Sequence, residues 1–242
     1  GVIRDITQKK HLAKHLAQAE KLAAVGQLAA GLAHEINNPI GVINCYANLI
    51  RKSARDVPAI IDDVSIIQKH TQICKTVVQD LLNFARVSDT CKARGDIRQA
   101  IDGVLDILAS QTGSKRIAVD RNYAGDCPDI VVDLDKMRQV FMNLIINAIQ
   151  AIEEDGRISV SVERTADPGQ IEIRVKDTGP GIPREYVDSI FDPFFTTKET
   201  GTGTGLGLSI SYGIIQEHGG DIQVSTQTGK GTTFTIILPV DA

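Results

Sequence analysis

The chain has 242 residues, of which 42% are hydrophobic and 23% are charged, and its formal net charge is -4. The acidic balance argues against nucleic acid as the main partner, and no apolar run approaches the ~20 residues that a membrane-spanning helix needs. Because domains commonly have ~100 to 150 residues, the length predicts two of them.

The first residues predict a linker ahead of these domains. GVIRDIT alternates apolar and polar side chains like the end of a strand, and KKHLAKHLAQAEKL is a charged helical stretch. This order resembles the last strand and exit helix of a PAS-type sensory module. We expect residues 1–20 to be a signal-input linker helix. Because the sequence begins at Gly1 and not at methionine, we also expect it to be part of a longer protein.

Residues 21–90 predict a helical hairpin. Apolar positions step by three and four residues in two series, Leu22, Val25, Ala29, Leu32 and Ile36, then Ile60, Val64, Ile67, Thr71, Cys74, Val78, Leu81 and Ala85. Between the series, Asp56 suits a helix N-cap and Pro58 suits the first turn of the second helix. A lone hairpin cannot bury both seams, so we expect a homodimer with a four-helix bundle. The alternative is a hairpin that rests on the second domain of its own chain.

A polar cluster interrupts the first helix in LAAGLAHEINNPIG, residues 28–41. His34 faces away from the apolar seam, with Glu35 beside it and Asn38 one turn later. A neutral imidazole can attack phosphorus, and a neighbouring carboxylate can accept its other ring proton. Pro39 removes one backbone hydrogen bond, so the helix should kink there. The zinc motif HExxH is incomplete because Asn38 occupies the second histidine position, and a solvated surface pair is the remaining alternative.

Strands alternate with helices after a linker near residues 88–95, and residues 96–242 predict the second domain. Helices are expected near 98–111, 134–152, 184–190 and 205–218, and strands near 116–122, 130–132, 157–165, 170–177, 221–226 and 232–238. This mixture predicts a sheet covered on one face by helices. The four cysteines, Cys45, Cys74, Cys91 and Cys127, form no CxxC pair, so we expect reduced thiols that serve as small hydrophobic side chains.

Four elements of the second domain predict a nucleotide site. Asn143 and Asn147 lie four residues apart on an otherwise mostly apolar helix, and DTGPGIP, residues 177–183, forms a tight turn after an apolar strand. GTGTGLGLSI, residues 201–210, is a glycine run that opens onto a helix, whose free amides and dipole suit phosphate. GKGT, residues 229–232, adds another turn, whereas no GxxxxGK[ST] motif occurs.

Together these motifs resemble the kinase core of a two-component sensor histidine kinase over roughly residues 20–240. LAHEINNPIG matches the histidine box of that family, NLIINA its N box, DTGPGI its first glycine box, FDPFFTTK its phenylalanine box and GTGLGLSI its second glycine box. The resemblance implies a dimeric four-helix bundle followed by a two-layer α/β sandwich of the type shared with gyrase and certain heat-shock chaperones. The forms NNP and NAIQAI are similar to the nitrogen-regulation type.

The resemblance also implies roles for individual residues. His34 would be the phospho-acceptor, Glu35 its acid/base partner, and Asn38 would orient water to hydrolyse a phospho-aspartate. The residues that it assigns to ATP and Mg²⁺ are Asn143, Asn147, Asp177, Gly179, Gly181, Lys198, Gly203, Gly205, Leu206, Gly207 and Thr232, with Asn147 as the metal ligand and Asp177 as the adenine contact. Residues 192–204 would form a lid that Phe194 and Phe195 anchor, unless these rings belong to the core. Gln150 departs from the basic residue that many members carry there, which leaves a phosphate contact from this position in doubt.

The implied activity is ATP-dependent autophosphorylation of His34, followed by transfer to an aspartate of a response-regulator receiver domain. This would take place in the cytoplasm, whether or not the parent protein is membrane-anchored. An ATPase clamp of the gyrase or chaperone class and a scaffold that lacks catalysis are the two rivals. The displayed His34 argues against the first, and the intact motifs argue against the second.

Overall fold

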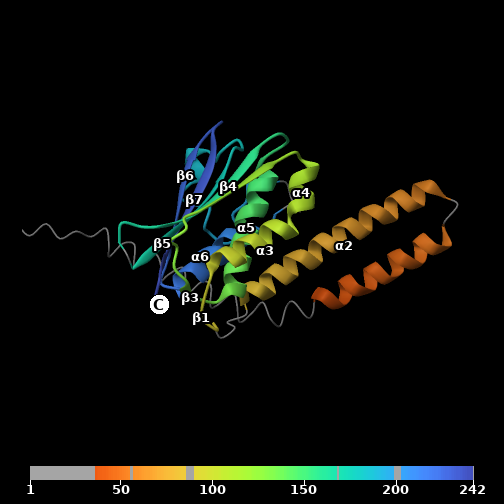
Figure 1. Ribbon diagram of the computed structural model, residues 1–242. Helices are drawn as coiled ribbons and strands as arrows, with labels where there is room; N and C mark the ends of the chain where they lie inside the picture. The colour runs from red at the N-terminus through yellow and green to blue at the C-terminus, as the bar shows by residue number, and fades with distance from the viewer. Residues whose placement is uncertain (1–35, 55–56, 86–89, 168, 199–202, 242) are drawn as a thin grey trace, which may run out of the picture. The chain divides into compact units, whose positions relative to one another are not determined.

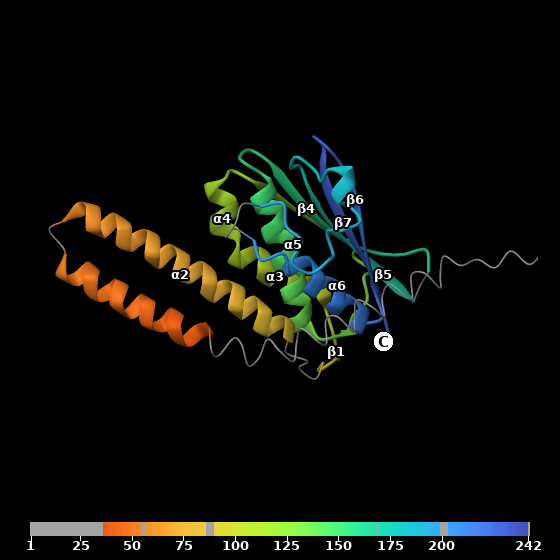
Figure 2. The ribbon, with the colours of Figure 1, turned by 180° about the vertical axis from the view of Figure 1, so that it is seen from behind.

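The computed structural model describes residues 36–54, 57–85, 90–167, 169–198 and 203–241. The chain divides into two compact units, Gly1–Ser88 with Thr196–Leu206 and Asp89–Phe195 with Gly207–Ala242. The first unit contains a long helical hairpin, and the second contains a sheet with helices packed on it (Figures 1 and 2).

Two helices form the hairpin, one over residues 36–53 and α2 over Pro58–Ala85. Pro58 begins α2 as expected, because the backbone N–H of the first helical residue would have no acceptor within the helix. Other expectations for the hairpin lie outside the described residues, namely the cap Asp56 and the seam residues Leu22, Val25, Ala29 and Leu32, together with the side chains of Leu81 and Ala85.

The expected seam of α2 consists of two rows with a spacing of seven residues. Val64, Thr71 and Val78 are buried. Ile60 and Ile67 are exposed by 38% and 42%, and Cys74, the next residue of their row, is exposed as well. A heptad helix with one row buried and the other open has a second apolar face still to be covered.

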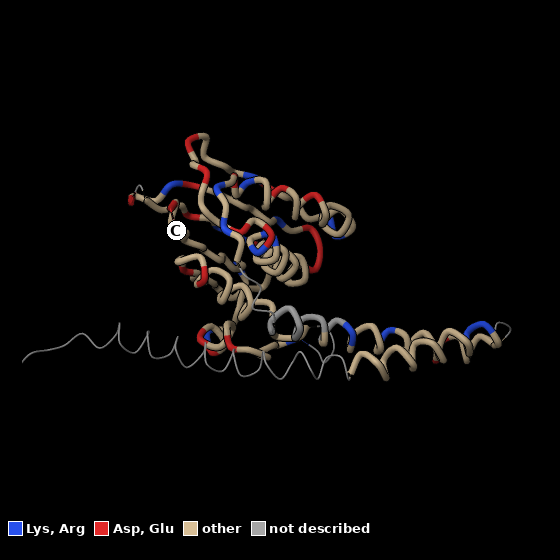
Figure 3. Tube along the Cα trace, turned by 90° about the horizontal axis from the view of Figure 1, so that it is seen from below, with Lys and Arg blue, Asp and Glu red and all other residues tan. Residues whose placement is uncertain are grey.

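The first hairpin helix has the same unbalanced surface. Ala47 is buried, whereas the large apolar side chains of the same helix are open, namely Ile36, Val42, Ile43, Tyr46, Leu49 and Ile50. No Lys, Arg, Asp or Glu occurs between residues 36 and 50. Figure 3 shows how few charged positions interrupt the two hairpin helices. None of the described helices combines the length and apolarity that membrane crossing requires.

The second unit has a five-stranded sheet in the order β2-β4-β5-β7-β6. Its strands are β2 (Ala118–Tyr123), β4 (Arg157–Arg164), β5 (Gln170–Asp177), β6 (Asp221–Gln227) and β7 (Gly231–Pro239). β2 runs parallel to β4, and the other neighbouring pairs are antiparallel. Burial alternates along β4, β5 and β7, so one face of the sheet supplies core side chains.

Helices cover that buried face (Figure 1). They are α3 (Ile97–Ile107), α4 (Ala109–Ser114), α5 (Leu134–Ala151) and α6 (Gly207–Glu217). Phe141 of α5, Ile173 of β5 and Ile236 of β7 are all fully buried in one hydrophobic cluster. The expected two-layer α/β sandwich is therefore confirmed, with α5 central in its helical layer.

A second, two-stranded sheet pairs β1 (Ala93–Gly95) with β3 (Ile130–Val132) in an antiparallel register. Residues 88–95 were expected to be a linker, but their last part belongs to the compact α/β unit. Asp96 then begins α3 as its N-cap, because its carboxylate accepts a hydrogen bond from the backbone N–H of Arg98 at 2.9 Å.

Three further expectations need correction. The helix expected near 98–111 breaks at Leu108, whose φ of -89° and ψ of 1° end α3 and precede α4, although no glycine or proline marks the break. The helix expected near 184–190 is only a 3-10 turn over Arg184–Tyr186. The four cysteines are free thiols, but only Cys127 packs as a buried side chain, and Cys45, Cys74 and Cys91 are exposed in the single chain.

Candidate nucleotide-binding site

Helix α5 carries the two asparagines predicted to contact a nucleotide. Asn143 and Asn147 are both half-buried on the same side of the helix. The Nδ2 of Asn143 donates to the carbonyl oxygen of Gly207 at 3.0 Å and to the Oγ of Ser211 at 3.3 Å. The amide of Asn143 therefore fixes the start of α6 against α5 and leaves its Oδ1 as an acceptor beside that helix end.

Asp177 ends strand β5, and only 4% of its surface is exposed. One carboxylate oxygen, Oδ1, accepts hydrogen bonds from the backbone N–H groups of Gly179 at 2.8 Å and Thr232 at 3.2 Å. Burial raises the pKa of this carboxyl against the opposing effect of the two hydrogen bonds. Both of these bonds use Oδ1, so neither of them occupies Oδ2.

Tight packing shapes the turn after Asp177. A Cβ on Gly179 would lie 2.9 Å from the Oδ1 of Asp177, and Gly181 has a φ of +75°. A Cβ on Gly181 would lie 2.4 Å from the carbonyl oxygen of Gln227, so only glycine fits there. The predicted importance of these two glycines thus has a concrete cause, which is the close approach of this turn to a carboxylate and to the end of β6.

The β6–β7 turn supports the turn at residues 178–183. The backbone N–H of Ile182 donates to the Oγ1 of Thr226 at 2.8 Å, and the N–H of Gly229 donates to the carbonyl oxygen of Pro180 at 2.7 Å. The Oγ1 of Thr226 also lies 3.2 Å from the Oγ1 of Thr232. Sequence reasoning missed Thr226, because a threonine within an alternating strand carries no distinguishing signal.

The carboxyl end of α5 has a support that the sequence did not reveal. The Nζ of Lys115 donates to the carbonyl oxygens of Ile149 at 2.8 Å and Ile152 at 2.6 Å. A cation at this end also interacts favourably with the helix dipole. Lys115 therefore fixes the end of the helix that lies next to Gly179, where an added Cβ would be 3.1 Å from the Cβ of Ala151.

The remaining glycine-run residues precede α6. Lys198 is exposed, and a Cβ on Gly203 would lie 3.0 Å from its Cδ. Gly205 has a φ of +68°, Leu206 is fully buried, and Gly207 begins an eleven-residue helix. The first turn of such a helix offers free backbone N–H groups and a positive dipole end to a phosphate.

The two phenylalanines of the predicted lid have different environments. Phe195 packs partly buried against the hydrophobic core, with its ring centroid 5.7 Å from that of Tyr186. Phe194 is 54% exposed and has a φ of +67°, which is uncommon for a bulky residue. Phe195 thus packs against the core, which fits either expectation, and its role as the anchor of a lid stays a prediction. Phe194 lies neither in the core nor against an aromatic partner among the described residues.

The structure brings together two groups of the expected site residues in the α/β unit, Asn143 with Gly207 and Asp177 with Gly179, Gly181 and Thr232. Asn38 belongs to the hairpin unit, where it is exposed on the helix of residues 36–53. His34 and Glu35 lie outside the described residues. Among the described residues, no group of three or more His, Cys, Asp or Glu side chains could hold a metal ion.

Two family models match the chain. The model described as "Histidine kinase-, DNA gyrase B-, and HSP90-like ATPase" matches residues 132–242, and the model described as "His Kinase A (phospho-acceptor) domain" matches residues 24–90. The two matches fall on the α/β unit that holds the candidate site and on the hairpin, respectively.

Individual proteins are similar over most of the chain. Signal transduction histidine-protein kinase AtoS of Escherichia coli (strain K12) is 35% identical to this chain over 99% of the chain. The matched region is 39% of the length of AtoS. Full-length ShkA in complex with AMPPNP has a TM-score of 0.74 and 25% identity, over 88% of this chain and 45% of that one. The catalytic domain of histidine kinase ThkA is 31% identical with a TM-score of 0.56, over 62% of this chain and 96% of that domain. ThkA in complex with response regulator protein TrrA has a TM-score of 0.68 and 27% identity, over 98% of this chain and 68% of that one.

Proposed function

The chain belongs to the histidine kinases, and on that premise we propose that it transfers the γ-phosphoryl group of ATP to His34 and then to an aspartate of a response regulator. The observation that carries the proposal is the buried carboxylate of Asp177, which Gly179 and Thr232 hold at the end of β5 through Oδ1 alone, so that Oδ2 takes no part in these two bonds. The family match of residues 24–90 to a phospho-acceptor domain supports His34 as the target.

In the first step, a ring nitrogen of neutral His34 attacks the γ-phosphorus. A nitrogen–phosphorus bond forms as the bond from phosphorus to the ADP oxygen breaks, and Glu35 accepts the other ring proton. In the second step, the phosphoryl group passes from His34 to an aspartate oxygen of the receiver domain. The similarity to ThkA, a histidine kinase solved in complex with response regulator protein TrrA, supports this class of partner.

We assign adenine to Asp177 and the phosphates to the α6 start at Gly207, with Asn143 and Asn147 beside it. Mg²⁺ fits this donor set, since it is usually held by one or two protein oxygens together with substrate phosphates, and Asn147 would supply its amide oxygen. When bound, Mg²⁺ neutralises charge on the transferring phosphoryl group. Lys198, Gly203, Gly205 and Leu206 are proposed to belong to the segment that covers the nucleotide.

We also propose that the chain works as a homodimer. All but two of the large apolar side chains exposed in the described part of the chain lie on the hairpin. The open row at Ile60, Ile67 and Cys74 is the second heptad row that a four-helix bundle would cover.

Four finer assignments complete the proposal. The forms NNP and NAIQAI support a nitrogen-regulation type, and the opening residues support an upstream PAS-type module. Because ATP is the donor, we place the activity in the cytoplasm. Asn38 is exposed on the helix that follows His34, which supports a phosphatase activity toward the phosphorylated regulator. Full phosphatase activity in Asn38→Ala would exclude that role.

The deciding experiment incubates wild type and His34→Gln with Mg²⁺ and γ-labelled ATP, with nucleotide binding measured on both proteins. We expect a label on the wild type alone that survives base and is lost in acid. Nucleotide binding without label on either protein would favour an ATPase clamp over a kinase.

A further inference from the structure

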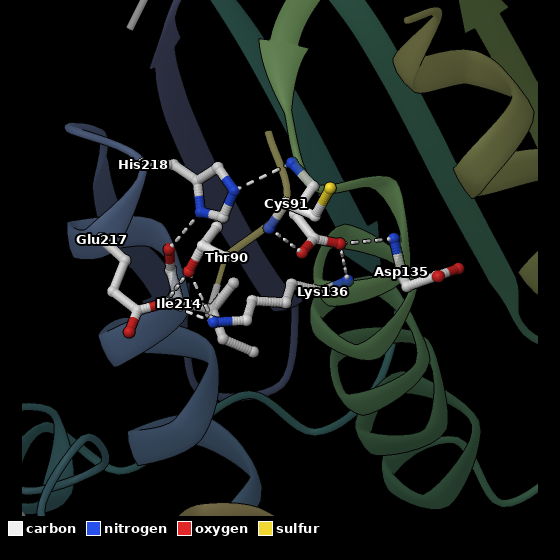
Figure 4. A network of polar contacts seen from close by, with 8 residues as sticks. Thr90, Cys91, Asp135, Lys136, Ile214, Glu217 and His218 are labelled. Carbon is white, nitrogen blue, oxygen red and sulfur yellow. Dashed lines mark hydrogen bonds and ion pairs between the residues drawn. The ribbon is translucent and has the colours of Figure 1, made fainter. Parts of the chain in front are cut away.

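A polar network joins the amino end of α5, the carboxyl end of α6 and the chain that arrives from the hairpin (Figure 4). Its centre is Asp133, the N-cap of α5, whose Oδ1 accepts from the backbone N–H groups of Asp135 and Lys136, each at 3.1 Å. The other oxygen, Oδ2, accepts from the backbone N–H of Cys91 at 3.0 Å. One carboxylate thus caps α5 and holds the incoming chain.

His218 holds the same cap from α6. Its side chain is fully buried, and its Nε2 accepts a hydrogen bond from the backbone N–H of Asp133 at 3.0 Å. Its Nδ1 lies 2.7 Å from the carbonyl oxygen of Ile214, to which it can only donate. The ring is therefore neutral with its proton on Nδ1, and it links the last turn of α6 to the first turn of α5.

A third contact closes the network around Thr90. The Nζ of Lys136 donates to the Oγ1 of Thr90 at 2.7 Å and to the Oε2 of Glu217 at 2.9 Å. The hydroxyl of Thr90 donates to the same Glu217 oxygen at 3.2 Å. The side chain of Lys136 is only 15% exposed, so water competes weakly for these bonds. From Thr90 the chain continues into β1, which pairs with β3 directly before Asp133.

The same two helices meet again at the nucleotide end, where Asn143 of α5 contacts Gly207 and Ser211 of α6. Asn143 is ten residues beyond Asp133, or about 15 Å along the helix axis. The antiparallel pair is therefore fastened at two places, and the chain from the hairpin takes part in one of them.

We propose that residues 90–91 form a regulatory contact in which their docking on Asp133, Lys136 and Glu217 fixes α5 against α6 and thereby strengthens nucleotide binding at the other end of the pair. This inference rests on the proposed ATP site and adds a route by which movement of the hairpin would reach it. If docking favours nucleotide binding, nucleotide binding favours docking by the same factor.

The test uses the full chain with AMPPNP and two readouts, nucleotide affinity and hydrogen exchange of the Cys91 amide. Lys136→Met removes the cation that holds Thr90, and Arg138→Met is the matched control, because Arg138 pairs on the same helix with exposed Asp135. We expect Lys136→Met to speed exchange at Cys91 and to weaken AMPPNP binding by roughly three- to tenfold, the range that one or two lost hydrogen bonds produce. Arg138→Met should change neither, and AMPPNP should slow the exchange in wild type.

Thr90→Val provides a milder variant in case Lys136→Met perturbs folding, since it removes only the hydroxyl between Lys136 and Glu217. Faster exchange at Cys91 with unchanged AMPPNP affinity would overturn the proposed coupling. Unchanged exchange in both variants would overturn the docking itself. A wild type that fails to bind AMPPNP would instead contradict the proposed function, and the exchange comparison would still decide whether residues 90–91 are docked.

Discussion

The side-chain amide of Asn143 donates to the backbone carbonyl of Gly207 at 3.0 Å, so a residue of α5 fixes the residue at which α6 begins. The contact places an asparagine oxygen next to the free N–H groups of a helix start. This is the part of the site in which phosphates and a metal ion would have to share one small region.

Asn143→Asp should impair both the helix contact and nucleotide binding. A carboxylate cannot donate to the Gly207 carbonyl, and its charge would repel phosphates. We expect AMPPNP affinity to fall by at least about tenfold and the melting temperature to fall by a few degrees. Titration calorimetry and a thermal melt measure the two effects. Gln150→Glu adds the same charge at an exposed position of α5, and an equal loss in that control would show that charge alone is responsible.

Asp177→Asn separates base recognition from folding. An amide oxygen can still accept from Gly179 and Thr232, but the amide nitrogen would face the amine of adenine. We expect adenine nucleotide affinity to fall about a hundredfold. Because burial raises the pKa of Asp177, its charged form is disfavoured in the fold, and the neutral variant should be as stable as wild type or more stable at neutral pH. Fluorescent-nucleotide binding and a thermal melt test this, with exposed Asp188→Asn as the control.

Gly181→Ala should destabilise the α/β unit. The added Cβ would lie 2.4 Å from the Gln227 carbonyl oxygen at a φ of +75°, so the turn after Asp177 must move. We expect a loss of about 2 kcal/mol or more in the free energy of unfolding. Gly103→Ala is the matched control, because its Cβ meets nothing within 4 Å on helix α3, and the higher helix propensity of alanine should stabilise it. Equal denaturation midpoints for the two variants would contradict this explanation.

Ile43→Asp and Ile67→Asp should disrupt the proposed homodimer. Both side chains are open in the single chain, at 48% and 42% exposure. If a second copy covers them, each substitution places two charges in an apolar interface, and we expect the dimer to weaken at least a hundredfold by analytical ultracentrifugation. Ile107→Asp makes the same change at an isoleucine outside the hairpin that is 67% exposed. This control should sediment with the same mass as the wild-type dimer. Wild type that sediments as a monomer would remove the dimer proposal.

Acid should loosen the network at His218. Burial lowers the pKa of the His218 imidazole, so its neutral form is favoured in the fold. The stabilisation is fully present above the unfolded pKa of about 6.5 and is lost as pH falls through the lower folded value. The charge of Lys92 opposes protonation of the ring, whereas the hydrogen bond with Ile214 and the charges of Glu217 and Asp133 favour it.

His218→Gln isolates that titration, because the glutamine oxygen can still accept from the Asp133 N–H but does not titrate. Between about pH 7.5 and about pH 5.5, we expect the melting temperature of wild type to fall by a few degrees more than that of the variant. Parallel pH profiles would mean that the pKa of His218 does not differ between the folded and the unfolded chain.

The sequence predicted those parts of the fold whose patterns are local and long. β5 occurs over 170–177 as expected, because its alternation is regular and a glycine turn follows it. β1 was missed because three residues of a polar stretch have no period, and only the pairing with β3 makes them a strand. The break at Leu108 was missed for a related reason, since it is set by tertiary packing and not by a helix-breaking residue.

The sequence likewise predicted only those residues of the candidate site that belong to a local pattern. The glycines and Asp177 were found because turns and a strand end carry recognisable residues. Sequence reasoning missed three residues that bind backbone groups far away in the sequence, namely Lys115, Thr226 and His218. A local sequence pattern cannot indicate such a contact. The role of Asn143 was found only in part, because the contact with Gly207 depends on how α5 meets α6.

The strand order places β7 between β5 and β6, and the described residues between Asp177 and Gly207 contribute no strand to the sheet. Both ends of this segment are fixed, one by Asp177 at the end of β5 and the other by the Asn143 contact at Gly207. Closing a flexible loop costs only about 0.6 kcal/mol more each time its length doubles. The turn at Gly181 and the core contact of Phe195 fix the first part of the segment, so a change of length would be tolerated only after Phe195. In the proposed kinase, the length of that later part would then set how quickly ADP escapes.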